Sequence, residues 1–282
     1  MKKFIAFLFI SMMFPLFAVA QEDDSKKDEK VTEKLERAAF EGSSIIENPS
    51  NVLFSKNTLE VQMSHRFDLI NEKNSLAGIY GNANIRIGLA YAITDRITVG
   101  YGTTKIDRLQ DFNLKVALLR QTQSNKIPVS VSYYGNFTVN ARLKENFNMI
   151  QDRYSFFNQI IIAKRFTPEF SLQIAPSVSH FNLVEPTMQN DLFAIAFGGR
   201  YKVSPQTAIL ADYTQPLTQF TTGNPHPGIS VGVEFATSGH AFQLFATNYN
   251  GLSLQKDNMF NTNNFFNGDF MIGFNITRKY NF

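Results

Sequence analysis

The chain has 282 residues, no cysteine and a formal net charge of +3, which includes two lysines close to its N-terminus. The absence of cysteine excludes disulfides, thiolate metal sites and thiol nucleophiles, and the near-neutral charge excludes a basic footprint for nucleic acid. The slightly negative mean hydropathy argues against a helical membrane protein but is ordinary for a β-barrel with a wet lumen.

Residues 1–20 have the three parts of a secretory signal peptide. Two lysines precede an apolar run over residues 4–17, and a small-x-small cleavage site, Ala18-Val19-Ala20, follows it. The apolar run is too short for a comfortable transmembrane helix, so we expect export and cleavage after Ala20. No later segment reaches roughly 18 uninterrupted apolar residues, so we expect any membrane crossing by the mature chain to use a barrel.

Residues 21–57 are expected to form a charged periplasmic N-terminal segment. Residues 21–41 carry charge throughout, with a weak helix expected over 29–40, and residues 42–57 look irregular around Asn48-Pro49-Ser50-Asn51. The favoured interpretation is a solvated tail. The alternative is a short helix that plugs the barrel or docks under it.

From residue 58 onward, twelve stretches of the chain alternate apolar and polar residues, which predicts twelve β-strands. The alternation is clearest over 83–93, where an apolar residue takes every second position. Successive strand side chains point to opposite faces, so each strand has one apolar and one polar face. The predicted strands are 58–67, 82–94, 96–104, 111–121, 127–138, 155–166, 169–181, 191–202, 207–215, 228–237, 240–249 and 268–278.

The connections between these strands are predicted to alternate strictly between short and long. Short turns are expected at 94–95, 124–126, 167–169, 204–206 and 238–239, and longer loops at 68–81, 105–110, 139–154, 182–190, 216–227 and 250–267. Bacterial barrels have this pattern of short periplasmic turns and long extracellular loops. The predicted fold is therefore an all-β, 12-stranded antiparallel up-and-down transmembrane β-barrel over 58–282, with both termini periplasmic.

The last predicted strand ends in an aromatic residue. Apolar residues share one face of this strand, and the chain stops at Phe282. Such a terminal aromatic resembles the signal that the outer-membrane barrel assembly machinery reads. We therefore expect the cell outer membrane as the location, with outer-membrane lipid and the assembly machinery as partners.

The two faces of the barrel carry different chemistry. The apolar face is expected to meet lipid, because a cationic side chain at the bilayer midplane costs about 2–4 kcal/mol. The polar face is expected to line the lumen, either as a mixed-charge pore wall or as a ladder of ion pairs that fills it. The charged lumen-lining candidates are Glu60, Arg66, Arg86, Lys115, Arg165, Arg200, Asp212, Glu234 and Asp269.

Catalytic and metal-binding patterns are weak. A hydrolase site needs Ser, His and an orienting acid within hydrogen-bond reach, but Ser64 and His65 are adjacent strand residues and point to opposite faces. The sequence has no HxxxH spacing, and its one GxSxG pentad, at 228–232, lies inside a predicted strand and not at the strand-to-helix turn that a nucleophile elbow requires. We therefore expect no enzyme, no cofactor and no metal.

Three sequence blocks are specific enough to suggest relatives: SHRF at 64–67, ANIRIG at 83–88 and GHAFQL at 239–244. These blocks resemble a family of bacterial outer-membrane β-barrel proteins catalogued only as a domain of unknown function, and the resemblance runs from about residue 58 to 282. It implies fold and location, and it brings no substrate or catalytic residue.

The sequence therefore favours a porin-like narrow channel or transport-related protein for small polar solutes. A twelve-stranded barrel lies between small barrels filled by side chains and large porins with an aqueous channel. A non-conducting barrel that scaffolds a periplasmic or surface partner is the alternative, and an outer-membrane enzyme comes third.

Overall fold

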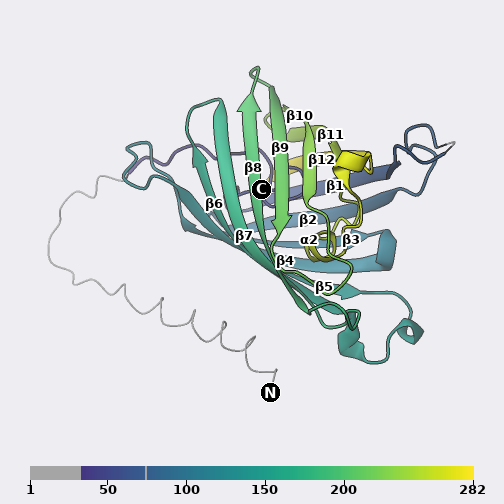
Figure 1. Cartoon of the computed structure of the whole chain (residues 1–282). Helices are drawn as coiled ribbons and strands as arrows, with labels where there is room; N and C mark the ends of the chain where they lie inside the picture. Colours follow the sequence, from purple (N-terminus) through teal and green to yellow (C-terminus); the bar gives the residue numbers. More distant parts are fainter. Residues whose placement is uncertain (1–32, 74) are drawn as a thin grey trace, which may run out of the picture. The chain divides into compact units, whose positions relative to one another are not determined.

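The computed structural model describes residues 33–73 and 75–282, so the signal peptide and residues 21–32 lie outside the described part. Twelve antiparallel strands form a closed barrel in which β1 pairs with β12 (Figure 1), as predicted. The strands are β1 (Thr58–Leu69), β2 (Asn84–Thr94), β3 (Ile97–Thr104), β4 (Leu109–Leu119), β5 (Ser130–Asn140), β6 (Tyr154–Arg165), β7 (Phe170–Phe181), β8 (Asp191–Lys202), β9 (Thr207–Pro216), β10 (Gly228–Ala236), β11 (His240–Thr247) and β12 (Met271–Asn281).

The predicted strand boundaries differ from the observed ones where backbone chemistry intervenes. β5 begins at Ser130 rather than at 127, because Pro128 has no backbone N–H to give to a ladder. β12 begins at Met271 rather than at 268, because Gly268 has a left-handed conformation (φ 87°) after the short helix η5 (Phe265–Asn267).

The connections lie at two ends of the barrel. The turn end carries 95–96, 120–129, 166–169, 203–206 and 237–239, and the loop end carries 70–83, 105–108, 141–153, 182–190, 217–227 and 248–270. The predicted strict alternation in length fails at 105–108 and 120–129. The first is short because η2 (Ile106–Arg108) turns sharply through positive φ at Asp107 and Arg108, and the second is lengthened by the late start of β5.

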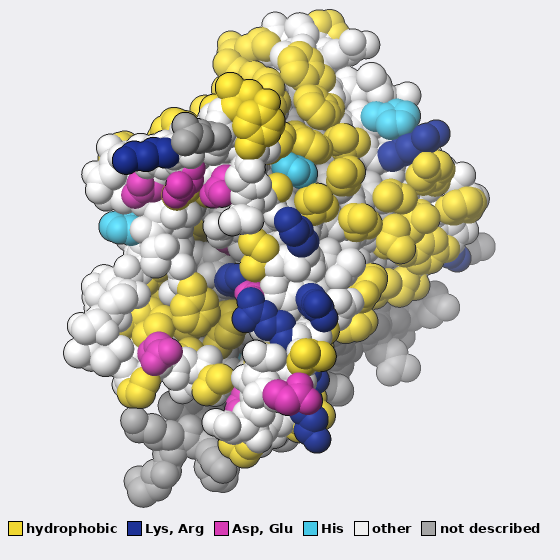
Figure 2. Space-filling model, turned by 90° about the vertical axis from the view of Figure 1, so that its right-hand side faces the viewer, with side chains coloured by type: hydrophobic (Ala, Val, Ile, Leu, Met, Phe, Trp, Pro, Cys, Tyr) yellow, Lys and Arg dark blue, Asp and Glu magenta, His cyan; other side chains and the backbone are white. Residues whose placement is uncertain are grey.

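Apolar side chains cover the outside of the barrel, and small or polar ones face inward. Phe193 is 58% exposed and Ile87 55% exposed, whereas Ala92 and Glu60 are fully buried. Figure 2 shows hydrophobic side chains spread over much of the strand surface. This is the arrangement predicted for a barrel in lipid, since a soluble barrel would turn its apolar face inward.

In the described part of the chain, helices are few and short. They are α2 (Leu254–Phe260), η2, η5, η3 (Lys144–Asn146) and η4 (Ile150–Arg153). Among the described residues, none of the helices is long and apolar enough to cross a bilayer.

Residues 39–54, here called the plug, lie inside the barrel. Phe40, Ile45 and Val52 pack in one cluster with Ala92 and Ala163 of the wall, and Ile45 is only 1% exposed. The plug enters from the turn end, because the chain before it pairs with residues 121–123 there and the chain after it leads into β1.

The plug corrects the favoured expectation of a solvated tail for residues 21–57, as far as they are described. Residues 33–40 also hold no helix, in contrast to the helix expected over 29–40. The physical reason is that the chain from Ile45 to Phe54 carries enough apolar side chains to gain from burial. The alternative of a plugging segment therefore describes the position of residues 39–54, but not their conformation.

Residues 248–270, here called the inner loop, fold into the barrel from the loop end. Their helix α2 contacts β6, β7, β8 and β9. Gln255 of α2 is buried and donates from Nε2 to Thr138 Oγ1 (2.7 Å) and Ser155 Oγ (3.2 Å) on the wall. The lumen is thus occupied from both ends.

Candidate functional site: the occluded lumen

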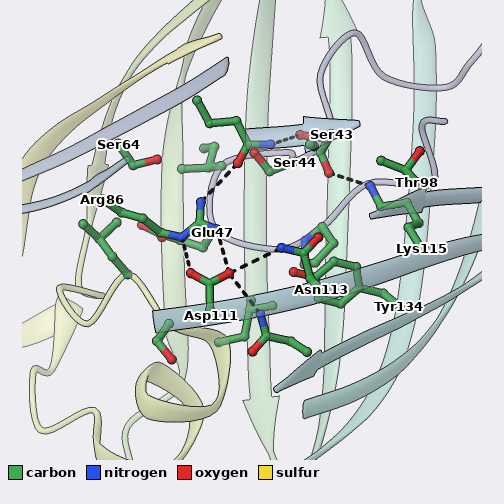
Figure 3. A pocket seen from close by; sticks show the side chains of 18 of the residues that line it. Ser43, Ser44, Glu47, Ser64, Arg86, Thr98, Asp111, Asn113, Lys115 and Tyr134 are labelled. Carbon is green, nitrogen blue, oxygen red and sulfur yellow. Dashed lines mark hydrogen bonds and ion pairs between the residues drawn. The ribbon is translucent and has the colours of Figure 1, made fainter. Parts of the chain in front are cut away.

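A polar cavity of about 110 Å³ remains between the plug, the inner loop and the wall formed by β1 to β5. Figure 3 shows that charged and amide side chains from the wall point toward plug residues in this space. A water molecule needs about 10–15 Å³ of such volume, so the cavity has room for a small cluster of waters. The cavity lining includes Ser43, Glu47, Arg86, Asp111, Asn113, Lys115 and Asp257.

Arg66 of β1 binds the plug residue Glu47 at two points. Its Nε lies 3.0 Å from Oε1 and its Nη2 lies 2.9 Å from Oε2. The guanidinium also donates to Asn275 Oδ1 (3.0 Å) and lies over the Phe245 ring, 4.5 Å from the ring centroid. Bidentate pairing and full hydrogen bonding are what a buried guanidinium requires.

Arg86 of β2 pairs with Asp111 of β4 across the intervening strand. Nε and Nη2 each lie 2.8 Å from a carboxylate oxygen, and Nη1 donates to Gln62 Oε1 at 3.1 Å. The pair passes over Gly102 of β3, where an added Cβ would collide with both charged groups. A glycine at this position is therefore required for the close approach of the two side chains.

Lys115 of β4 holds the backbone of the plug. Its Nζ donates to the carbonyls of Ser43 (2.9 Å) and Val52 (3.3 Å). Glu60 of β1 accepts from Ser43 Oγ, and from Gln62 Nε2 at 2.6 Å. A cation and an anion on the wall thus fix the beginning and the end of the plug.

Asp212 of β9 accepts several hydrogen bonds from one turn of the plug. The amides of Glu47 (2.9 Å) and Asn48 (2.8 Å) and the Asn48 side chain (2.8 Å) all donate to its carboxylate. Charge-assisted bonds of this kind are roughly twice as strong as neutral ones. Asp212 therefore fixes the turn of the plug that also carries Glu47.

Neutral amides of the wall reach the remaining plug carbonyls. Gln243 donates to Ile45 O (2.7 Å), Asn275 to Ile46 O (3.0 Å) and Gln173 to Pro49 O (2.8 Å). These donors come from β11, β12 and β7, so the plug is held from most of the barrel circumference.

The structure brings most of the predicted lumen-lining residues together. Arg200 pairs with Glu234 (2.9 Å) and with Glu41 (3.5 Å), which adds to the pairs described above. Arg165 ends β6 at the turn end, where it donates to the Thr167 and Pro168 carbonyls. Asp269 is a correction: because β12 begins only at Met271, it lies in the inner loop, half-buried, and accepts from Asn71 and Asn264.

Three partners of these charges, Glu41, Glu47 and Asp111, are absent from the predicted lumen-lining set. Glu41 and Glu47 were assigned to a solvated tail, although the apolar pair Ile45-Ile46 beside them indicates burial. Asp111 shares the inward parity of Asn113 and Lys115, which was a sufficient signal to include it. The inner loop was expected outside the barrel, and its buried Gln255 and Asn258 give no periodic pattern that predicts insertion.

Asp257 of the inner loop is the titratable group that closes the cavity from the loop end. Its carboxylate accepts from the amides of Gly251 (2.7 Å) and Ser253 (3.2 Å). Burial, and then the negative charge of Glu47, raise the pKa of Asp257 to about 7. The inner loop is therefore sensitive to pH near neutrality.

Catalytic and metal sites were not expected, and that expectation stays a prediction. In residues 33–73 and 75–282, no group of three or more histidine and carboxylate side chains is placed to hold a metal ion. The ring nitrogens of His180 lie 2.8 Å from Asp191 Oδ1 and 3.0 Å from Asn182 Oδ1. Phe282 is 80% exposed at the turn end, and its role as an assembly signal also stays a prediction.

Comparison with known proteins agrees with this architecture. The model of a family described as "Membrane bound beta barrel domain (DUF5777)" matches residues 40–280. Among solved structures, the NanC porin is similar with a TM-score of 0.51 and 7% identity, over 79% of this chain and 100% of that chain. The KdgM porin is also similar, with a TM-score of 0.47 and 5% identity over 80% of this chain and 99% of that chain. An outer membrane channel from Pseudomonas putida F1 has a TM-score of 0.47 and 12% identity over 81% of this chain and 97% of that chain. No curated protein matches the chain.

Proposed function

The chain belongs to the family of membrane bound β-barrel domains, DUF5777, and from that premise we propose that it is an outer-membrane channel for small polar solutes, closed by the plug. The observation that carries this proposal is the chemistry by which the wall holds the plug. Lys115, Gln243 and Asn275 donate to backbone carbonyls of the plug. Water or a polar solute can accept the same hydrogen bonds at similar enthalpy.

The shape of the wall also supports a removable plug. Where the apolar side chains of the plug pack, the wall presents small inward residues, which include Ala92, Ala163 and Gly198. A barrel filled permanently by its own strands instead interdigitates large side chains across the lumen. Here the wall leaves space in the lumen, and the plug, which precedes β1 in the chain, fills that space.

A second candidate function is a non-conducting scaffold. The observation in its favour is that the lumen charges are satisfied in the closed state, with Arg66, Arg86 and Arg200 each paired to a carboxylate. If the plug never leaves, the barrel displays its loops and turns and moves no solute.

A disulfide between the plug and the wall separates these functions. A Cβ added at Gly198 would lie 3.5 Å from Ile45 Cγ1 and 3.8 Å from Ile45 Cγ2, so cysteines at both positions are within disulfide range. The native chain has no cysteine to interfere. We expect I45C/G198C in planar bilayers to be silent when oxidised, and to conduct when reduced.

Deletion of residues 21–54 gives the complementary measurement. We expect the deleted barrel to conduct small ions continuously, since the plug is then absent. The single variant I45C is the matched control for the disulfide experiment, because it cannot form the lock and adds no atom at Gly198. A deleted barrel that shows the heat-dependent gel shift of a folded barrel but never conducts would overturn the channel and favour the scaffold.

A further inference from the structure

A second cavity lies at the loop end, on the side of the inner loop away from the plug. It has a volume of about 250 Å³ and is bounded by the β3–β4 and β5–β6 connections and by α2. A solute that enters the barrel from the loop end meets this cavity before it reaches the constriction at α2. The site is separate from the plug contacts described above.

One side of this cavity carries cations. Arg153 lies with its guanidinium over the Phe147 ring, 5.0 Å from the ring centroid, and one of its terminal nitrogens donates to the Arg142 carbonyl. Its Nε is buried and has no hydrogen-bond partner among the described residues. A buried donor without an acceptor costs free energy, which an acceptor on a ligand recovers.

The carboxylates of the same cavity are already engaged. Asp107 pairs with both Lys256 and Arg142, so one negative charge is shared by two cations. Asp152 accepts from the Met149 amide at 2.8 Å within its own turn. Within the lining, Arg153 and Lys256 balance Asp107 and Asp152, and Arg142 adds a further positive charge beside Asp107 from outside the lining. The group that favours an anionic ligand is therefore Arg153, whose Nε has no hydrogen-bond partner among the described residues.

The cavity also has an apolar and aromatic part of its lining. Phe181 and Phe260 meet edge to face, with ring centroids 4.9 Å apart, and Leu109 and Leu183 extend this surface. Aromatic rings pack favourably against such edges and faces. The cavity is therefore amphipathic, with aromatic side chains that can bind a ring and cationic side chains in the same lining.

The volume limits the size of the ligand. An engineered cavity of about 150 Å³ binds benzene, so about 250 Å³ accommodates one ring with a short polar substituent. We propose that this cavity binds a monocyclic organic acid, with its ring against Phe181 and Phe260 and its carboxylate at Arg153 and Lys256. Binding of such an acid goes beyond the proposed channel function, because equilibrium binding can be measured without conductance. If either proposal fails its test, the other can still be tested.

Calorimetric titration of the full mature chain in detergent with benzoate tests the proposal. We expect saturable binding of one benzoate per chain, and at least about tenfold weaker binding of benzyl alcohol, which keeps the ring but lacks the charge. R153Q should weaken benzoate binding by at least about tenfold, the scale of a lost charge-assisted hydrogen bond. K144Q, in the same connection but outside the cavity, should leave it unchanged.

Two results would overturn the inference. One is equal affinity of the folded wild-type protein for benzoate and benzyl alcohol, or no saturable binding of benzoate at all. The other is an R153Q variant that retains the heat-dependent gel shift of a folded barrel and binds benzoate as tightly as wild type. The comparison of benzoate with benzyl alcohol uses only wild-type protein. It therefore tests whether the cavity prefers an acid even if R153Q fails to fold.

Discussion

Glu47 and Arg66 join the plug to the barrel wall by a two-point ion pair at 3.0 and 2.9 Å, with both side chains nearly inaccessible to solvent. Removing one member of such a pair leaves a buried charge without a partner, which costs far more than loss of an exposed pair. The position of the plug therefore depends strongly on the charge of one residue in the segment before β1.

Substitution of Glu47 by glutamine should release the plug. Neutralising a buried partner of Arg66 costs about 3–5 kcal/mol, and we expect that cost to favour an undocked plug. A cysteine placed at Ile45, which is 1% exposed, reports release through its rate of maleimide labelling. The rate should rise by about two to four orders of magnitude in E47Q and stay unchanged in E145Q, which alters an exposed loop glutamate.

Packing of the plug should depend on one methyl group opposite Gly198. A Cβ at this position would collide with Ile45 Cδ1, so G198A should destabilise the docked plug by about 1–3 kcal/mol through overpacking. I45V removes that methyl and should restore docking in the G198A background. Thermal unfolding of the two single variants and the double variant measures this, and additive losses in the double variant would contradict the contact.

Stability of the inner loop should fall as pH rises toward neutrality. The pKa of Asp257 is raised from its usual 3.8 to about 7 in the folded protein. Between those values the folded state binds more protons than the unfolded state, so stability decreases with increasing pH. Each pH unit between these two pKa values lowers the free energy of unfolding by at most about 1.36 kcal/mol. The total loss across the whole pH range is therefore at most about 4 kcal/mol.

The variant D257N isolates this pH effect, because asparagine does not ionise and its Oδ1 can keep the shorter of the two hydrogen bonds, the one from the Gly251 amide. Thermal unfolding at pH 5 and pH 8 should show a loss of stability in wild type that D257N largely lacks. An equal pH dependence in both proteins would assign the effect to other groups.

The loop end should face the cell exterior, and the turn end the periplasm. Single cysteines at residue 145 in the β5–β6 connection and residue 205 in the β8–β9 turn lie in exposed parts of opposite ends. A membrane-impermeant maleimide should label position 145 on intact cells and position 205 only after lysis. The reverse pattern would invert the topology.

The strand architecture could be predicted because it depends on a local pattern. Alternation such as Ile85, Ile87 and Leu89 follows directly from side chains pointing to opposite faces at every second residue. The strand predicted at 191–202 has those bounds in the structure, and the apolar face lies outside as expected. Turn chemistry was the weaker signal, as Pro128 and Asp107 shift the connections around β4.

The lumen contacts could not be predicted in the same way. Parity alone indicates that Arg66 and Asp212 point inward, but it does not say which groups they meet. Their partners Glu47 and Asn48 lie outside the repeating pattern, and Asn48 is far from Asp212 along the chain.

By itself, therefore, the sequence determined the number of strands, their two faces and the inward position of most of the charged candidates. The reason is that the two-residue alternation of a strand can be read within each segment of the sequence. Only the tertiary structure decided that the plug and the inner loop fill the lumen. Their burial depends on the space left by small wall residues such as Ala92 and Gly198, and on charges brought together by closure of the barrel. Both are properties of the assembled wall, and no single segment carries them.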